Sequence, residues 1–275
     1  MILVTGATGN VGHNLVRELI NAGEKVRALT RDPATTALPD SVEIVPGDLT
    51  RPETLPAALK DVDRAFLFPV FGALDGFLTA AKEAGTRHIV LLSSAAVTFP
   101  QLGWIGEQHL ACEQAVADSG MSWTFVRPSV FMANDLGWAH QVKHGGIVRG
   151  AYGGAAMAPV DERDIAAVAA HALLSPRPGK AYELTGPQAL SQIERVRIIG
   201  ETLGLSARFE EMPRNDVRRQ LLDHMPPPAA DFLLDQLAAA QAEPDSVLPT
   251  IEQVTGHPAR TYAEWVAHHV ADFGG

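Results

Sequence analysis

The glycines near the start of the chain constrain its fold more than any other feature. Residues 2–4 are apolar and predict a short buried strand, and glycines follow at positions 6, 9 and 12. From Asn10 onward, apolar residues recur at helical spacing, which predicts a helix directly after the glycines. A strand, a glycine-rich turn and a helix in this order are typical of a loop that binds a dinucleotide pyrophosphate.

Each glycine has its own physical task in such a loop. Gly6 permits the tight turn, Gly9 lets the backbone approach the phosphates, and Gly12 allows the helix to pack closely on the strand. The free N–H groups at the helix N-terminus then face the anion. A tight turn in another kind of α/β domain is the alternative, but the flanking strand and helix favour cofactor binding.

Strands and helices alternate through the first half of the chain. Apolar runs predict strands at residues 2–4, 25–30, 42–45, 64–68, 88–92 and 122–126, with helices beginning at Asn10 and spanning 52–59, 73–84 and 107–119. Such alternation requires right-handed crossovers between parallel strands. We therefore expect an α/β fold of the Rossmann type, a doubly wound parallel sheet with helices on both faces.

The alternation stops after residue 128. Glycines between 145 and 154 predict a loop-rich stretch, and the later patterns predict a helix at 161–174, a strand at 181–184, a helix at 191–203 and a short strand at 208–211. Helices fill the remainder, with a break at the prolines 226–228. We expect residues 1–150, with a returning strand near 181–185, to form the nucleotide-binding domain. Residues 151–275 would form a smaller, mostly helical substrate lobe that is interleaved with it.

Composition limits the partners and the compartment. The net charge is −10, so we expect no binding to nucleic acid or to an anionic membrane surface, since both repel an acidic protein. Cys112 is the single cysteine and excludes an intrachain disulfide, in agreement with a reducing compartment. We find no signal peptide and no membrane-spanning stretch, and expect a cytoplasmic protein. No metal site is predicted, because His140 and His144 lack a supporting carboxylate or cysteine.

The end of the second predicted strand indicates which nucleotide is bound. Arg31 stands where an arginine accommodates the 2′-phosphate of NADP. Asp32 is the competing signal for the ribose hydroxyl of NAD, but Pro33 after it assigns Asp32 to the following turn. We therefore expect NADP(H), with NAD(H) as the less favoured alternative. After the third strand, Asp48 can either accept a hydrogen bond from the adenine amino group or close a turn, and both remain open.

Segments spread along the whole chain carry a family resemblance. They are TGATGNVG, ALTRDP, GDL, LLSSAAV, SWTFVRPSVFM, APVDERDIA, YELTGPQALS and the late VTGHPARTYAEWV. Together they resemble the NmrA-like branch of the atypical short-chain dehydrogenase/reductases. The resemblance implies a Rossmann fold with a small C-terminal substrate lobe. Members of this branch include NADPH-dependent reductases of quinones and triphenylmethane dyes, and also non-catalytic NADP-binding redox sensors.

The resemblance also assigns site residues, position by position. It implies that the pyrophosphate loop comprises Gly6, Thr8, Gly9, Asn10, Val11 and Gly12. Further cofactor contacts would be Arg31, Asp48, Leu49, Phe68, Pro69, Ser93, Pro128 and Ser129. Ser94 falls at the position of the superfamily's active-site serine and is a candidate catalytic residue.

The Tyr-x-x-x-Lys pair, the usual proton-donating pair of that superfamily, is absent from this chain. None of the 3 tyrosines has a lysine four residues later, since those positions hold Ala156, Gly186 and Val266. By the resemblance, Ile105 occupies the tyrosine position and His109 the lysine position. The ordinary pKa of histidine lies near neutrality, so His109 is a candidate proton donor. A contact with the ribose, or an exposed place on the helix, is the alternative.

Aromatic and apolar residues follow the carboxyl ends of the predicted strands, where open α/β sheets bind their ligands. The candidates for an apolar substrate pocket are Phe71, Trp104, Phe131 and Met132. Such a pocket would suit a flat, hydrophobic or aromatic small molecule, whereas packing between the two lobes is the alternative role for these side chains.

Two functional hypotheses follow from an intact cofactor loop beside a missing Tyr/Lys pair. The first is an NADPH-dependent oxidoreductase that passes hydride directly to a quinone-like or other conjugated acceptor, which needs no strong built-in acid. The second is a non-catalytic NADP(H)-binding redox sensor, which would regulate a protein partner. Turnover with a small acceptor separates the two.

Overall fold

The computed structural model describes residues 1–274 and divides into two compact units. Unit 1 comprises Met1–Pro100, Gly106–Pro128 and Glu162–Leu184, and unit 2 comprises Gln101–Ile105, Ser129–Asp161 and Thr185–Gly275. This division differs from the boundary that we predicted at residue 150, because residues 129–150 fall in unit 2. Each unit has its own sheet and is described by itself.

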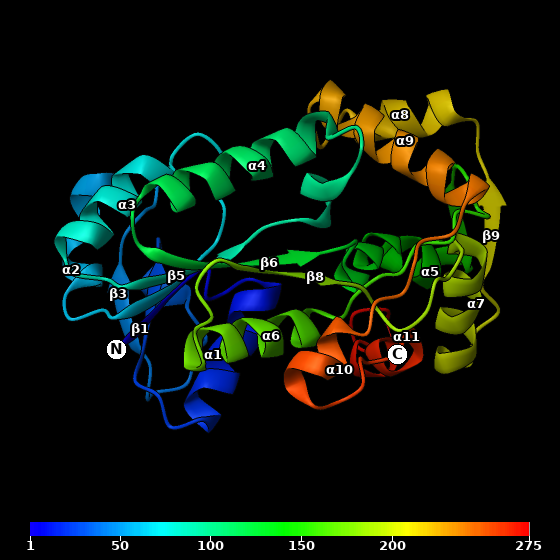
Figure 1. The fold of residues 1–275 in the computed structure, drawn as a ribbon. Helices are drawn as coiled ribbons and strands as arrows, with labels where there is room; N and C mark the ends of the chain where they lie inside the picture. Colours follow the sequence, from blue (N-terminus) through cyan, green and yellow to red (C-terminus); the bar gives the residue numbers. More distant parts are fainter. Residues whose placement is uncertain (275) are drawn as a thin grey trace. The chain divides into compact units, whose positions relative to one another are not determined.

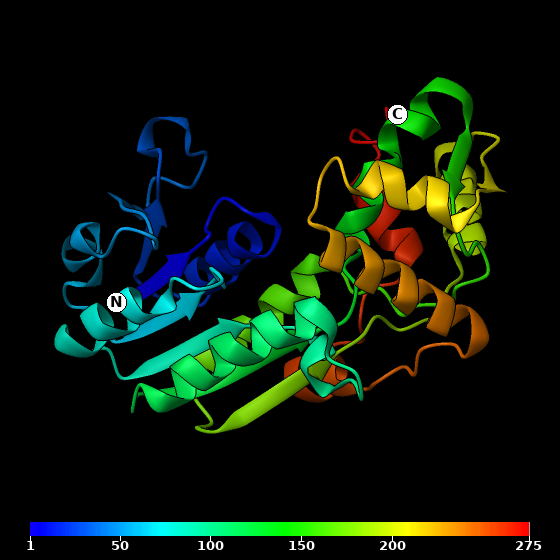
Figure 2. The same cartoon turned by 90° about the horizontal axis from the view of Figure 1, so that it is seen from above.

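Unit 1 contains a 7-stranded parallel sheet with the order β3-β2-β1-β4-β5-β6-β8, seen from above in Figure 2. The strands are β1 (Ile2–Thr5), β2 (Val26–Thr30), β3 (Glu43–Pro46), β4 (Arg64–Leu67), β5 (His88–Leu92), β6 (Ser122–Pro128) and β8 (Lys180–Leu184). Because β1 pairs with β2 on one side and with β4 on the other, the direction of winding reverses at β1. Ligands of open α/β sheets bind at the carboxyl edge beside such a reversal.

Helices cover both faces of the sheet in unit 1 (Figure 1). The helices α1 (Asn10–Asn21) and α6 (Glu162–Leu174) lie on one face, and α3 (Leu74–Glu83) and α4 (Gly103–Asp118) lie on the other. β1 and β5 are buried at every position, as expected for parallel strands that are covered on both faces. The predicted Rossmann-type doubly wound sheet is therefore confirmed.

Shorter elements complete unit 1. They are α2 (Pro56–Leu59) and the 3-10 helices η1 (Pro33–Thr35), η2 (Pro52–Thr54) and η3 (Ala95–Thr98). The helix predicted at 52–59 is thus divided into η2 and α2, since Pro56 cannot donate a backbone hydrogen bond within a continuous helix. The helix predicted at 107–119 begins earlier, at Gly103.

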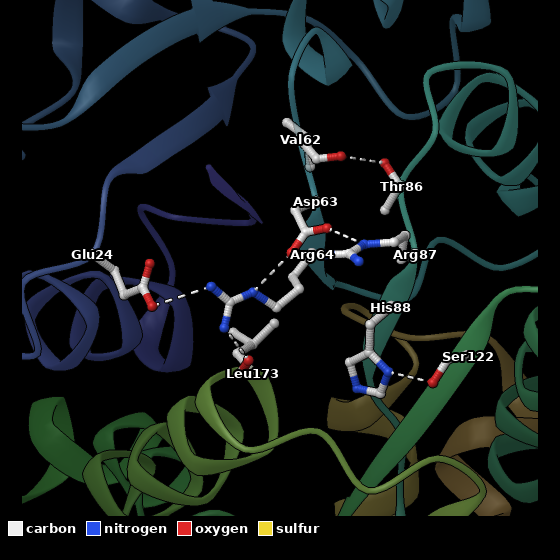
Figure 3. A network of polar contacts seen from close by, with 9 residues as sticks. All are labelled: Glu24, Val62, Asp63, Arg64, Thr86, Arg87, His88, Ser122 and Leu173. Carbon is white, nitrogen blue, oxygen red and sulfur yellow. Dashed lines mark hydrogen bonds and ion pairs between the residues drawn. The ribbon is translucent and has the colours of Figure 1, made fainter.

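Polar contacts fix the strands at the amino edge of the sheet, away from the predicted site (Figure 3). Arg64, the first residue of β4, donates to the backbone carbonyl of Leu173 at 2.6 Å and pairs with Glu24 at 3.1 Å. On the neighbouring strands, His88 Nδ1 lies 2.8 Å from the hydroxyl of Ser122. These contacts join the start of β4 to the end of α6, and the starts of β5 and β6 to each other.

Unit 2 is mostly helical. Its helices are η4 (Met132–Trp138), α5 (Ala139–Gly145), α7 (Gln192–Leu203), α8 (Arg214–Leu221), α9 (Pro227–Ala242), α10 (Thr250–Thr255) and α11 (Tyr262–His268). The strands β7 (Ile147–Gly150) and β9 (Arg208–Glu211) pair in parallel, so the loop predicted for 145–154 is wrong at β7, whereas the strand at 208–211 is confirmed. Over residues 1–274, no helix has both the length and the apolar character to cross a membrane.

A buried ion pair joins three helices of unit 2. Arg195 on α7 donates to both carboxylate oxygens of Asp135 on η4, at 2.8 and 2.6 Å. The hydroxyl of Tyr262 on α11 donates to the same carboxylate at 2.6 Å. The side chains of Arg195 and Asp135 are only 4% and 6% exposed, and the guanidinium also lies 5.0 Å from the centre of the Trp138 ring. This cluster therefore holds its charges almost entirely out of water.

Candidate functional site

Most of the predicted site residues lie at the carboxyl ends of adjacent strands in unit 1. The loop after β1 carries Gly6, Thr8, Gly9, Asn10, Val11 and Gly12; Arg31 follows β2; Asp48 and Leu49 follow β3; Phe68, Pro69 and Phe71 follow β4; Ser93 and Ser94 follow β5; Pro128 ends β6. Because neighbouring parallel strands end at the same edge, the sheet brings these residues to one edge. Trp104, Ser129, Phe131 and Met132 belong to unit 2.

The glycine loop has the geometry that its sequence predicts. Gly6 adopts φ +62°, in the left-handed region that favours glycine, and its amide oxygen accepts from the backbone N–H of Gly9 at 3.0 Å. A Cβ atom added to Gly12 would lie 2.1 Å from the carbonyl oxygen of Gly6, so only glycine lets α1 pack this closely. At Gly9 the nearest atom would be that same oxygen at 3.3 Å, and Gly9 itself is exposed.

The N-terminus of α1 is open to an anion. Gly9 is its N-cap and offers no side-chain acceptor, and the first turn contains no acidic residue among those described. The amide N–H groups of this turn, together with the positive end of the helix dipole, therefore face outward without a competing carboxylate. This arrangement fits the pyrophosphate of a dinucleotide.

At the predicted nucleotide end of the site, Arg31 and the neighbouring Asp32 have different roles. The Asp32 carboxylate accepts from the backbone N–H of Ala34 at 3.1 Å and caps η1, so Asp32 belongs to the turn. Arg31 is exposed at the end of β2. Asp48 accepts from both the N–H and the hydroxyl of Thr50, each at 2.8 Å, and these hydrogen bonds hold its pKa below the usual range.

Asp48 thus closes a turn, one of the two roles that the sequence left open, and its contact with adenine remains a prediction. Leu49 is buried at 8% exposure and packs in the core of unit 1. Its side chain therefore anchors the loop after β3 to the hydrophobic core. A contact between Leu49 and the adenine would have to come from its backbone or from the exposed remainder of the side chain.

A buried charge network, which the sequence did not reveal, anchors α4 at this edge. The hydroxyl of Ser93 donates to Glu113 at 2.6 Å, and Arg127 donates to both oxygens of the same carboxylate at 2.8 and 2.7 Å. The Glu113 side chain is only 4% exposed. Ser93 is therefore engaged with Glu113 rather than free to donate to a cofactor. Ser93 follows β5, whereas Glu113 lies on α4 and Arg127 on β6, so no local sequence spacing indicates that these residues are in contact.

Ser94, the candidate catalytic serine, keeps its proton available. Its oxygen accepts from the backbone N–H of Ala96 at 3.2 Å, which starts η3. Among the described residues, none accepts the proton of the Ser94 hydroxyl. A hydroxyl that is held through its oxygen can still donate to an oxygen atom of a bound ligand.

His109 lies on α4, one turn before Glu113. Its ring meets the ring of Phe71 edge-on, with centroids 5.1 Å apart and planes at 81°. Within the described chain, its buried Nδ1 has no hydrogen-bond partner. Burial lowers the pKa of His109 to about 4, although the negative charge of Glu113 opposes this shift. The imidazole is therefore neutral at neutral pH, which argues against the predicted role of His109 as proton donor.

The unit 2 residues that we predicted for the site have structural roles within that unit. Met132 is 1% exposed in the core of unit 2, which leaves it almost no surface for a substrate. Phe131 packs against the same core but stays partly exposed. The hydroxyl of Ser129 donates to the carbonyl of Ala158 at 2.8 Å, and Trp104 is half-buried. Of the apolar residues in this set, Phe131 and Trp104 retain exposed surface, and Met132 does not.

Comparison with known proteins identifies the family of the chain and the kind of cofactor that this family binds. Residues 6–176 match the family model described as NAD(P)H-binding. A (4-alkanoyl-5-oxo-2,5-dihydrofuran-3-yl)methyl phosphate reductase from Streptomyces griseus is 41% identical, over 99% of both chains. An NAD(P)H azoreductase from Xenophilus azovorans is 38% identical, over 100% of this chain and 99% of its own.

Solved structures extend the comparison. An NADPH-dependent quinone oxidoreductase from Escherichia coli has a TM-score of 0.82 at 28% identity, over 98% of this chain and 99% of its own. Its complex with NADPH has a TM-score of 0.81 at 26% identity, over the same shares of the two chains. These relatives confirm the resemblance to the NmrA-like branch that the sequence motifs indicated. The chain belongs to the NAD(P)H-binding family.

Proposed function

We propose that this protein is an NADPH-dependent oxidoreductase that transfers hydride directly from the cofactor to a small conjugated acceptor. The observation that carries the proposal is the loop between β1 and α1. Its glycines permit a backbone approach that a Cβ atom would block, and they present an uncapped helix N-terminus. The NAD(P)H-binding family and the named relatives, which are reductases, support this cofactor and this reaction class for the chain.

The class of acceptor follows from what the relatives have in common. Their names specify a dihydrofuranone with oxo and alkanoyl groups, an azo compound and a quinone. Each of these acceptors has an electron-poor, conjugated π-bond. Such a bond accepts hydride without prior protonation by a strong acid, so a site that lacks the Tyr-x-x-x-Lys pair is sufficient. We therefore assign an acceptor of this electronic class to the chain.

We assign a separate role in binding or catalysis to each group of residues in unit 1. The N-terminal N–H groups of α1 bind the pyrophosphate, and Arg31 binds the 2′-phosphate. When bound, NADPH supplies the hydride. The hydroxyl of Ser94 donates a hydrogen bond to an oxygen atom of the acceptor, because its own oxygen is already held by Ala96. Since His109 is neutral, water delivers any proton that the product needs.

Turnover tests the proposal directly. We expect the purified protein to oxidise NADPH with at least one acceptor from a panel of quinones, azo dyes and α,β-unsaturated lactones, followed by the loss of absorbance of NADPH. Aliphatic ketones should be inert, because their reduction depends on a proton donor that this chain lacks. Saturable binding of NADPH without turnover on the whole panel would overturn the enzyme proposal and favour the redox-sensor hypothesis.

Selectivity for NADPH is expected to depend on Arg31. Replacing Arg31 with alanine removes a charge-assisted contact with the 2′-phosphate, which should weaken NADPH binding by about 10- to 100-fold. NADH lacks this phosphate, so its dissociation constant should stay unchanged. Arg51 supplies the control, since it is exposed and pairs with Glu53. Equal losses of NADPH affinity in Arg31→Ala and Arg51→Ala would contradict a specific role for Arg31.

We place the protein in the cytoplasm. Cys112 is the single cysteine, so the chain has no intrachain disulfide to form. Burial raises the pKa of the Cys112 thiol to about 11, which keeps it protonated and unreactive. The chain is therefore suited to a reducing compartment, and fractionation of cells that express it tests the assignment.

A further inference from the structure

Ser93, which precedes the candidate catalytic residue Ser94, is fixed from two sides. Its backbone N–H donates to the carbonyl of Val126 on β6 at 2.7 Å, and its hydroxyl donates to Glu113 on α4 at 2.6 Å. Only 3% of Ser93 is exposed, so water does not compete for these hydrogen bonds. The carboxyl end of β5 is therefore held against a neighbouring strand and against a helix at the residue before Ser94.

The Glu113 carboxylate that accepts from Ser93 has a fixed position of its own. Its oxygen Oε1 accepts from Ser93 and from Nε of Arg127, and its Oε2 accepts from Nη2 of Arg127. Two parallel hydrogen bonds between a guanidinium and a carboxylate fix the orientation of the carboxylate as well as its distance. Arg127 also lies 3.9 Å from Glu183 on β8, so the anchor of Ser93 belongs to a network that joins the ends of three strands to α4.

Ser94 itself is held by the turn that follows it. Its hydroxyl oxygen accepts from the N–H of Ala96 at 3.2 Å, and its carbonyl accepts from the N–H of Val97 at 3.3 Å, both in η3. Over residues 1–274, no hydrogen bond joins Ser94 to another strand or to α4. The location of Ser94 relative to the sheet therefore depends on its covalent bond to Ser93.

We propose that the Glu113–Arg127 ion pair positions the Ser94 hydroxyl through Ser93, so that Ser94 meets the oxygen atom of the acceptor in a productive geometry. The inference rests on the proposed function, in which that oxygen gains negative charge as the hydride arrives. A donor stabilises a developing charge only at hydrogen-bond distance, and a misplacement of about 1 Å can cost roughly 100-fold in rate. Ser93, Glu113 and Arg127 are thus positioning residues, which affect the reaction only through Ser94.

A double-mutant cycle in kcat tests whether Ser93 acts through Ser94. Ser93→Ala deletes the hydrogen bond to Glu113 and leaves the ion pair with Arg127 whole, so no buried charge loses its partner. We expect Ser93→Ala to lower kcat by about tenfold and Ser94→Ala by about 10- to 100-fold, with the dissociation constant of NADPH within about twofold of the wild type. In the Ser94→Ala background, Ser93→Ala should cause no further loss of kcat, because no hydroxyl remains to be positioned.

Ser122→Ala is the matched control. It removes a serine hydroxyl of the same sheet from its contact with His88 at the amino edge. This variant should lower the melting temperature about as much as Ser93→Ala does and leave kcat unchanged. If Ser93→Ala does not fold, Ser93→Cys takes its place, since it keeps the volume and its thiol is only a weak donor.

Amide hydrogen exchange supplies a readout that needs no turnover. The N–H groups of Ala96 and Val97 both donate to Ser94, so they exchange faster when the first turn of η3 opens more often. We expect faster exchange at both positions in Ser93→Ala, and wild-type rates in Ser122→Ala.

Three results would overturn the inference. The first is an equal fold-loss of kcat by Ser93→Ala with and without the Ser94 hydroxyl, which would make the anchor a general structural contact. The second is wild-type kcat in Ser94→Ala, which would leave no hydroxyl in need of positioning. The third is wild-type exchange at Ala96 and Val97 in Ser93→Ala. Failure of the proposed function is distinguishable, because the wild type would then bind NADPH without turnover on the whole panel, and the exchange rates alone would decide whether Ser93 holds Ser94 in place.

Discussion

Replacing Gly12 with alanine is expected to reduce NADPH affinity by at least about 100-fold, the largest effect of any single substitution in the cofactor loop. The added Cβ atom would lie 2.1 Å from the carbonyl oxygen of Gly6, 2.7 Å from its carbonyl carbon and 2.9 Å from the Cα of Ala7. All three are backbone atoms, so no side-chain rotation relieves the overlap. The helix must move away from the loop, and its N–H groups then lose their alignment with the pyrophosphate.

Two further glycine variants separate binding from folding. Gly9 adopts φ −83°, which alanine tolerates, and its added Cβ would lie 3.3 Å from the Gly6 oxygen. Gly9→Ala should therefore lower the melting temperature much less than Gly12→Ala and still weaken NADPH binding, because its methyl group occupies the approach of the phosphates. Gly145→Ala, with no atom within 4 Å of the added Cβ, should change neither quantity. Wild-type NADPH affinity in Gly12→Ala, measured by fluorescence titration, would contradict the predicted loop.

The fold of unit 1 could be predicted because its signals are local. The strand at 2–4, the glycines and the helix after them are consecutive in the chain, and each later strand is a short apolar run between turns. Parallel order follows from the alternation of strands and helices, without knowledge of any contact. β7 was missed for the opposite reason. Its four residues lie among glycines and pair with β9 across a long separation, so no local pattern marks them as a strand.

The features of the site also divide into those that follow from local sequence and those that depend on packing. Asp32 could be assigned to the turn because Pro33 follows it, and its carboxylate indeed accepts from the backbone N–H of Ala34. The contact of Arg31 with the 2′-phosphate stays a prediction. The partnership of Glu113 with Arg127 could not be predicted, since it depends on how α4 packs on β6. The low pKa of His109 also arises from packing. A sequence gives only the ordinary value for histidine, whereas burial decides the charge that the folded protein carries.

The buried ion pair of unit 2 makes the stability of the fold sensitive to substitution, because each of the two charges needs the other as its partner. Arg195 and Asp135 are desolvated, and their attraction offsets the cost of removing both charges from water only while both are present. The Tyr262 hydroxyl also relies on Asp135 as its acceptor. Loss of Asp135 would therefore leave the buried charge of Arg195 and the buried hydroxyl of Tyr262 without this acceptor, which is costlier than loss of an exposed pair.

Asp135→Ala is accordingly expected to lower the free energy of unfolding by about 3–5 kcal/mol, measured by urea denaturation followed through tryptophan fluorescence. Glu201→Ala is the control, because it breaks an ion pair with Arg197 whose side chains are 59% and 61% exposed, and it should cost less than about 1 kcal/mol. Replacing both partners, Asp135→Leu with Arg195→Met, should recover part of the loss, since no buried charge remains. If Asp135→Ala costs no more than the control, or if the double variant is less stable than Asp135→Ala, the cost does not come from an unpaired buried charge.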